Sequence, residues 1–116
     1  MTIKIGMVTF DASDAAALAA WWAQVIGGEV ADQSGGWFVM VSSPDNPTLG
    51  FQKVADPTPG KNKLHLDMAG PNYAAEKDRL VGLGAELVAE HTMEFGTWTV
   101  FADPEGNQFC LADFAG

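Results

Sequence analysis

The sequence predicts an α+β fold in which two βαβββ modules of one chain form a half-open mixed sheet with the helices on its outer face. Three observations support this prediction. The 116 residues, 47% of them hydrophobic and 18% charged, are typical of a single globular domain, 1–116, with its own core. The order strand, helix, strand, strand, strand can be followed twice along the chain. A segment rich in proline and glycine divides the two occurrences, so we expect a first module at about 1–55, a linker at 56–62 and a second module at about 63–116.

The first module begins with a strand predicted at 2–10, where β-branched and apolar residues alternate with others. Short polar side chains at 11–14 favour the start of a helix, and apolar residues at helical spacing predict a helix over 15–26. Gly27 is expected to end this helix, because glycine tolerates the left-handed cap conformation. Turn-forming residues separate three further predicted strands, at 29–32, 37–42 and 48–54.

The second module repeats this order after the linker. A strand is predicted at 63–69 and a helix at 73–83, with Gly84 as the residue that stops it. The last three strands are predicted at 85–91, 98–102 and 108–113.

The two modules can also be overlaid residue by residue. Met7 then falls on His65, and Gln52 falls on Cys110. We favour duplication of one module over a chance match, because the element order and the turn residues both repeat.

Charge and hydropathy exclude several classes of partner. The chain has 6 Lys+Arg against 15 Asp+Glu, so its net charge of −9 opposes nucleic-acid binding. The acidity would favour a cationic ligand, but solubility is the commoner reason for such a charge. No apolar run is long enough to span a membrane, and we expect no membrane partner. One cysteine, Cys110, cannot form an internal disulfide, and the first residues lack the apolar core of a secretory signal, so a cytoplasmic location is expected.

One face of the predicted sheet is unusually polar. Side chains alternate across a strand, and the more apolar set of each strand should pack on the helices. Polar groups on the remaining concave face suggest a ligand site, although they could instead pair with one another or with water. Trp98 is predicted to form an aromatic wall of this site, and further candidates for its walls are Phe38, Met40 and Phe101. The candidate ligand-binding residues are Met7, Thr9, Gln52, His65, Asp67, Trp98 and Cys110.

Three segments carry a resemblance to a known family: DAAALAAWWAQVIGG at 14–28, PGKNKLHLD at 59–67 and WTVFADPEGNQFCL at 98–111. With these segments the chain resembles the glyoxalase/bleomycin resistance protein/dioxygenase group, the vicinal oxygen chelate superfamily, and within it the glyoxalase-like domain subgroup. The resemblance implies paired βαβββ modules around a cleft, a small-molecule ligand and a homodimer. Whether the cleft forms within one chain or across two chains is left open.

The resemblance also implies where a metal would bind. In metal-using members four ligands stand on the first and last strands of the modules, and these positions are Met7, Gln52, His65 and Cys110 here. Only His65 is a standard ligand, Gln52 is a permitted neutral one, and both carboxylates are missing. We therefore predict no metal and no cofactor, with a soft ion such as Cu(I) as the alternative.

The function expected from the sequence is metal-independent binding of a compact aromatic or cationic molecule, for sequestration or resistance. The alternative is a metal-independent lyase or isomerase of dehydratase type, in which His65 is the catalytic acid or base. A metal-dependent lyase or dioxygenase is less favoured, and whether the protein is an enzyme stays open. Asp67 would orient His65 or neutralise a cationic ligand, whereas Cys110 is expected to be inert, because no Lys or Arg adjoins it.

Overall fold

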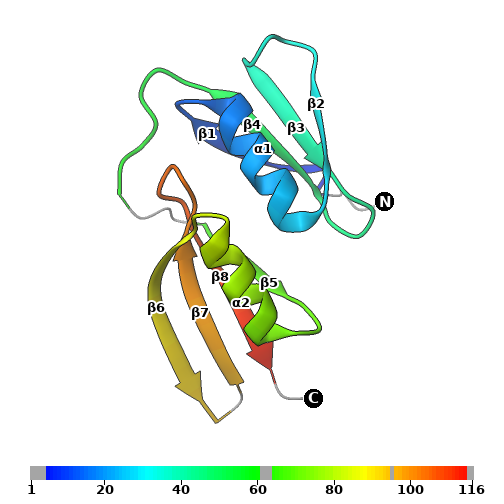
Figure 1. The fold of residues 1–116 in the computed structure, drawn as a ribbon. Coiled ribbons are helices and arrows are strands. Elements are labelled where there is room, and N and C mark those ends of the chain that lie inside the picture. The colour runs from blue at the N-terminus through cyan, green and yellow to red at the C-terminus, as the bar shows by residue number, and fades with distance from the viewer. Residues whose placement is uncertain (1–4, 61–63, 95, 115–116) are drawn as a thin grey trace. The chain divides into compact units, whose positions relative to one another are not determined.

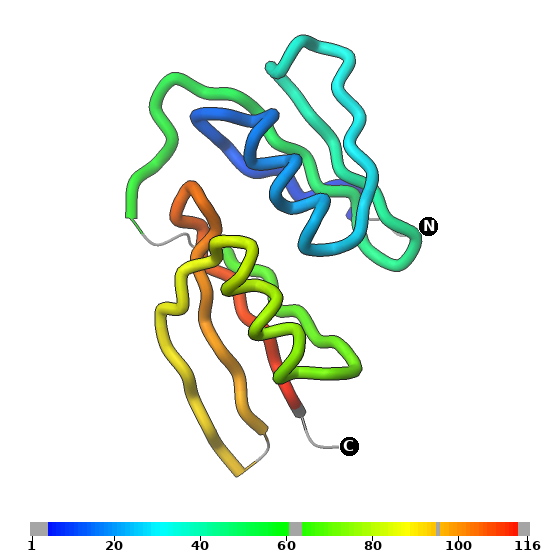
Figure 2. Tube along the Cα trace, in the orientation of Figure 1, coloured from blue at the N-terminus to red at the C-terminus, as the bar shows by residue number. Residues whose placement is uncertain are grey.

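The computed structural model describes residues 5–60, 64–94 and 96–114. The chain divides into two compact units, one up to Thr58 and one from Pro59, which correspond to the two modules and are described separately. Figures 1 and 2 show that each unit consists of one helix lying across one face of its own sheet.

The first module forms a mixed four-stranded sheet. Its elements are β1 (Met7–Ala12), α1 (Ala15–Ile26), β2 (Glu29–Asp32), β3 (Phe38–Ser42) and β4 (Thr48–Lys53). The strand order is β1-β4-β3-β2, in which β1 and β4 are parallel and the other neighbours are antiparallel.

The second module repeats this topology. Its elements are β5 (Leu66–Ala69), α2 (Tyr73–Gly82), β6 (Glu86–Met93), β7 (Gly96–Ala102) and β8 (Gln108–Phe114). The strand order β5-β8-β7-β6 has the same single parallel pair, β5 with β8. The predicted α+β class with two βαβββ modules is therefore confirmed, and each module builds its own sheet.

Side-chain caps explain where the two helices begin. The carboxylate of Asp14 accepts a hydrogen bond from the Ala17 amide at 3.0 Å, and the Asn72 amide oxygen accepts one from Ala75 at 3.2 Å. Helix α1 ends at Gly27, whose φ of 68° is left-handed as predicted. Of the described helices, neither is long and apolar enough to cross a membrane.

Strand boundaries were predicted less well than helices. The strand expected at 2–10 begins at Met7 and continues to Ala12, while its residues 2–4 lie outside the described ranges. The strand expected at 98–102 begins earlier, at Gly96, because Gly96 pairs with Met93 of β6. Ladder pairing thus extends strands through residues that have little strand propensity of their own.

The core of each module lies between its helix and one sheet face. In the first module, the Phe10 ring stacks on Phe51 at 4.9 Å and lies 5.6 Å from Trp22. In the second, Phe101 stacks on Phe109 at 5.7 Å. We call the opposite side of each sheet its open face, because the helix of the same module does not cover it.

A polar link ties α2 to its sheet. The hydroxyl groups of Tyr73 and Thr99 are hydrogen-bonded, and the Thr99 hydroxyl donates to Glu90 at 3.4 Å. The ammonium group of Lys77 in α2 donates to the same carboxylate. This ion pair holds the pKa of Glu90 below its ordinary value and raises the pKa of Lys77.

Two glycine-to-alanine substitutions should have opposite effects on stability. A Cβ at Gly28 would lie 2.8 Å from both the Ser42 carbonyl oxygen and Val41 Cγ1, whereas a Cβ at Gly82 in α2 would meet nothing within 4 Å. Urea unfolding should show Gly28→Ala destabilised by about 1–3 kcal/mol through overpacking. Gly82→Ala should be stabilised by up to about 1 kcal/mol through helix propensity. A stabilising Gly28→Ala would contradict the close packing of β2 against β3.

The Lys77–Glu90 pair predicts a specific pH dependence. Because the folded pKa of Glu90 is depressed, the pair stabilises the fold above about pH 4.5 and loses this effect as pH falls through the folded value. The urea midpoint of the wild type should therefore fall more between pH 6 and pH 3 than that of Glu90→Gln. Glu86→Gln, at an exposed position of the same strand, is the matched control and should follow the wild type.

Candidate functional site

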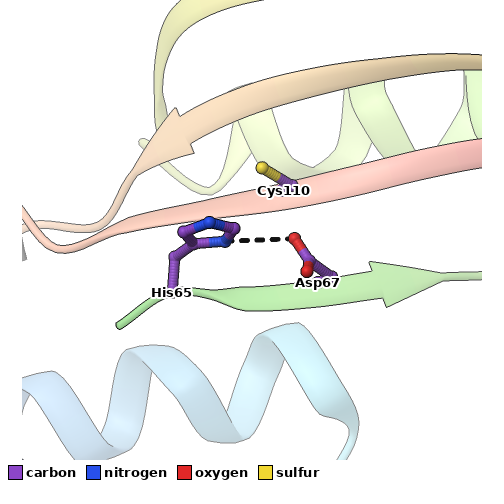
Figure 3. A group of neighbouring side chains, drawn as sticks. All are labelled: His65, Asp67 and Cys110. Atoms are coloured by element: carbon purple, nitrogen blue, oxygen red, sulfur yellow. Dashed lines mark hydrogen bonds and ion pairs between the residues drawn. The ribbon is translucent and has the colours of Figure 1, made fainter. Parts of the chain in front are cut away.

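Three candidate residues of the second module come together on its open face. His65 lies directly before β5, and its Nδ1 is 3.1 Å from Oδ1 of Asp67. One nitrogen of His65, one carboxylate oxygen of Asp67 and Sγ of Cys110 all lie within 4.8 Å of one another. Figure 3 shows the hydrogen-bonded His65 and Asp67 side chains, with Cys110 on the neighbouring strand β8.

The parallel pairing of β5 with β8 explains this cluster. Asp67 and Cys110 are register partners, so their side chains emerge side by side on the same sheet face. His65 precedes Asp67 by two residues, and alternation places it on that face as well.

The cluster has an accessible polar part and a covered sulfur. The side chains of His65 and Asp67 are 44% and 67% exposed, whereas Cys110 retains only 8% of its surface. A molecule arriving from solvent would therefore meet the imidazole and the carboxylate first and the thiol beneath them.

The hydrogen bond to Asp67 fixes the role of each imidazole nitrogen. An ionised carboxylate only accepts hydrogen bonds, so Nδ1 of His65 carries the proton that it donates. In the neutral imidazole, Nε2 is then a hydrogen-bond acceptor or a base.

Trp98 occupies the same open face on the far side of β8. Its register partners are Ala112 on β8 and His91 on β6, and the neighbouring row of β7 pairs Val100 with Cys110. The Trp98 and His91 rings stack at 5.2 Å with an interplanar angle of 30°. Sequence reasoning missed His91, because alternation cannot show which residue of β7 a residue of β6 faces.

Small side chains separate the aromatic stack from the polar cluster. Ala69 on β5 pairs with Ala112 on β8, and Ala112 pairs in turn with Trp98. Because adjacent strands lie about 4.8 Å apart, Trp98 and Ala69 stand roughly 10 Å from each other across this row. The open face thus presents a polar group and an aromatic surface with little side-chain bulk between them.

One predicted wall residue lies on the other face. Phe101 pairs with Phe109 and stacks on it in the core beneath α2, so the prediction that it lines the site is wrong. In the first module, Phe38 and Met40 do belong to the open face, since their partners are Gln52 and Gly50.

The candidates of the first module are spread along the sheet. Met7 pairs with Thr48, whereas Gln52 pairs with Asp11, four residues further along β1. At about 3.3 Å per residue, the Cα atoms of Met7 and Gln52 lie roughly 13 Å apart along the strand direction. Thr9 lies between these rows and pairs with Gly50.

The register also changes which residues of the two modules correspond. By register, Asp11 beside Gln52 matches Asp67 beside Cys110, so Thr9 takes the place that His65 has in the second module. The sequence overlay matches the helix N-caps Asp14 and Asn72 along with Met7 and His65, so the first strands of the two modules differ by two residues in their register against the last strands. A shift of two residues leaves every side chain on the same face, so alternation cannot reveal it.

The metal positions implied by the resemblance are brought together in the second module and not in the first. Within the first module Met7 and Gln52 are too far apart along the sheet to share one. In the described part of the second module, His65, Asp67 and Cys110 offer one nitrogen, one oxygen and one sulfur donor, a set that suits a borderline ion such as Zn²⁺.

Comparisons with known proteins give one family and one fold. The model of a glyoxalase-like domain family matches residues 7–112. A search of curated protein sequences finds no significant match.

Several solved structures are similar to this chain over nearly its whole length. A glyoxalase/bleomycin resistance protein/dioxygenase family enzyme from Burkholderia phytofirmans PsJN has a TM-score of 0.82 and 18% identity, over 97% of this chain and 100% of that one. A superfamily member from Sphaerobacter thermophilus has a TM-score of 0.73 and 19% identity, over 96% and 97%. Lactoylglutathione lyase from Agrobacterium tumefaciens has a TM-score of 0.72 and 18% identity, over 96% and 93%. At these identities the likeness bears on the fold alone.

The contact between His65 and Asp67 predicts the tautomer of one of the two histidines. Above the titration range of histidine, long-range ¹H–¹⁵N spectra should show His65 protonated at Nδ1. In Asp67→Asn the amide can donate to Nδ1, so the proton should move to Nε2. His91, stacked on Trp98, is the internal control and should keep its spectrum; a wild-type His65 protonated at Nε2 would contradict the contact.

Proposed function

This chain belongs to the glyoxalase-like domain family of the glyoxalase/bleomycin resistance/dioxygenase superfamily, and we propose that it binds a small organic molecule on the open face of its second sheet without a metal. The observation that carries the proposal is the pairing of two kinds of surface on that face. The exposed His65–Asp67 pair supplies polarity, and the Trp98–His91 stack supplies an aromatic surface. Ligand sites in proteins commonly combine a few polar groups with such surfaces.

The favoured ligand is a flat aromatic molecule with a positive charge. A ring system gains dispersion and quadrupole attraction against an indole, and a cation near the ring adds to both. Asp67 can neutralise the charge, and the net charge of −9 attracts cations toward the protein. Ala69 and Ala112 put no large side chain of their own between these groups.

Binding of this kind requires no ion. Stacking and charge pairing orient the ligand directly, and of the four positions used by metal-dependent relatives the two in the first module, Met7 and Gln52, lie four residues apart along the sheet. The role we propose is sequestration, since a protein that only holds its ligand needs affinity for it and no catalytic group.

A lyase or isomerase is the second candidate function. The observation in its favour is the hydrogen bond from His65 Nδ1 to Asp67, which leaves Nε2 of the neutral ring as a base. His65 would then move a proton of the bound molecule, and Asp67 would stabilise the resulting imidazolium.

The ligand class can be tested with a panel of N-methylated aromatic cations and their neutral analogues, followed by calorimetry. Trp98→Ala should weaken binding of cations and neutral rings about tenfold, through loss of stacking. Asp67→Asn should weaken the cations alone, by a few-fold, because its carboxylate is exposed. Trp37→Ala is the matched control, since this exposed tryptophan of the first module lies beneath Lys53. If Trp98→Ala leaves the dissociation constant unchanged and Trp37→Ala raises it, the site lies elsewhere.

The two candidate functions differ in their response to one substitution. If the protein sequesters its ligand, the ligand should be recovered chemically unchanged from both the wild type and His65→Ala. If it is a lyase or isomerase, mass spectrometry should show product with the wild type, and His65→Ala should abolish turnover while the dissociation constant changes little.

A further inference from the structure

Cys110 has surroundings that its sequence neighbours do not reveal. No Lys or Arg adjoins it in the chain, and inert packing was therefore expected. The fold, however, brings an imidazole nitrogen and a carboxylate oxygen within 4.8 Å of its sulfur. An ordinary thiol is only a few per cent thiolate at neutral pH. A base beside Cys110 can take its proton and so make the sulfur a better nucleophile.

The three groups are of the kinds that form an activated nucleophile: a thiol, a base and a group that orients the base. Asp67 accepts the proton of His65 Nδ1 and so orients the ring. Nε2 is left as the nitrogen that can accept the Cys110 proton. The exposed His65 side chain can close the remaining gap by rotation, and such contacts are often long before a ligand binds.

We propose that Cys110 is a nucleophile that reversibly captures those aromatic ligands of the open face of the second sheet that also carry a soft electrophile, an α,β-unsaturated carbonyl group. The proposal rests on the proposed function, because the captured molecule is one that this face binds. It adds a covalent bond to that binding and assigns His65 as the base and Asp67 as the positioning residue.

The step needs no oxidant and has no leaving group. His65 Nε2 removes the Cys110 proton, and the sulfur forms a bond to the β-carbon of the ligand. The electron pair of the carbon–carbon double bond moves to the α-carbon and carbonyl oxygen as an enolate. His65 then returns the proton to the α-carbon, so thiol and alkene become one thioether. The reverse sequence releases the ligand.

The first module provides a built-in comparison. Its corresponding residues are Thr9, Asp11 and Gln52, so the carboxylate is present but the imidazole and the thiol are not. Asp11→Asn therefore removes an exposed carboxylate at the matching register position without touching the cluster.

The experiment measures alkylation of the only cysteine by N-ethylmaleimide, followed by intact-protein mass spectrometry in the presence of EDTA. At pH 7 the folded chain should react at least about tenfold faster than the same chain in urea, where Cys110 is an ordinary exposed thiol. Cys110→Ser should form no adduct. His65→Ala should lower the folded rate about tenfold, and added imidazole should restore part of it.

Asp67 is tested by the same rate. Asp67→Asn should slow alkylation several-fold, Asp67→Glu should recover most of the rate, and Asp11→Asn should leave it unchanged. A folded chain that reacts more slowly than the chain in urea, with no effect of His65→Ala, would overturn the assignment of Cys110 as a nucleophile. The proposed function would survive that result if Cys110→Ser still bound the aromatic cations. A wild type that is alkylated fast but does not bind the aromatic cations would instead overturn the proposed function.

Discussion

The parallel pairing of the first and last strand of each module is the constraint on which the candidate site depends. A parallel pair needs a crossover connection, and the helix and two intervening strands provide it in both modules. The pairing decides which two side chains emerge side by side, and in the second module these are Asp67 and Cys110. Alternation then adds His65 to the same face, so three candidate residues from two segments of the chain form one cluster.

Periodicity and capping chemistry were sufficient to predict the elements and their faces. Helix α1 has the predicted bounds, because Asp14 caps its start and only a residue tolerant of a positive φ, Gly27, fits its end. The open-face assignment of Asp67 follows from alternation alone. Register could not be predicted, since a shift of two residues preserves every face, and the sequence therefore contained no sign that Thr9 takes the register position of His65.

The two modules share a topology but differ in chemistry. Each has a carboxylate beside the residue of its last strand, Asp11 by Gln52 and Asp67 by Cys110. Only the second module adds an imidazole to this pair, together with the stacked rings of Trp98 and His91 on the same face. Among the described residues, the imidazole, the thiol and the stacked rings thus lie in one module, while both modules keep the same topology.

The central claim is that His65, Asp67 and Cys110 serve an organic ligand and not a resident metal ion. The most direct measurement is elemental analysis of natively purified protein, followed by titration with manganese, iron, nickel, zinc and copper. We expect substoichiometric metal throughout and no tight uptake of any of these ions. One tightly bound ion per chain that is lost in His65→Ala would contradict the claim and would identify the cluster as a metal centre.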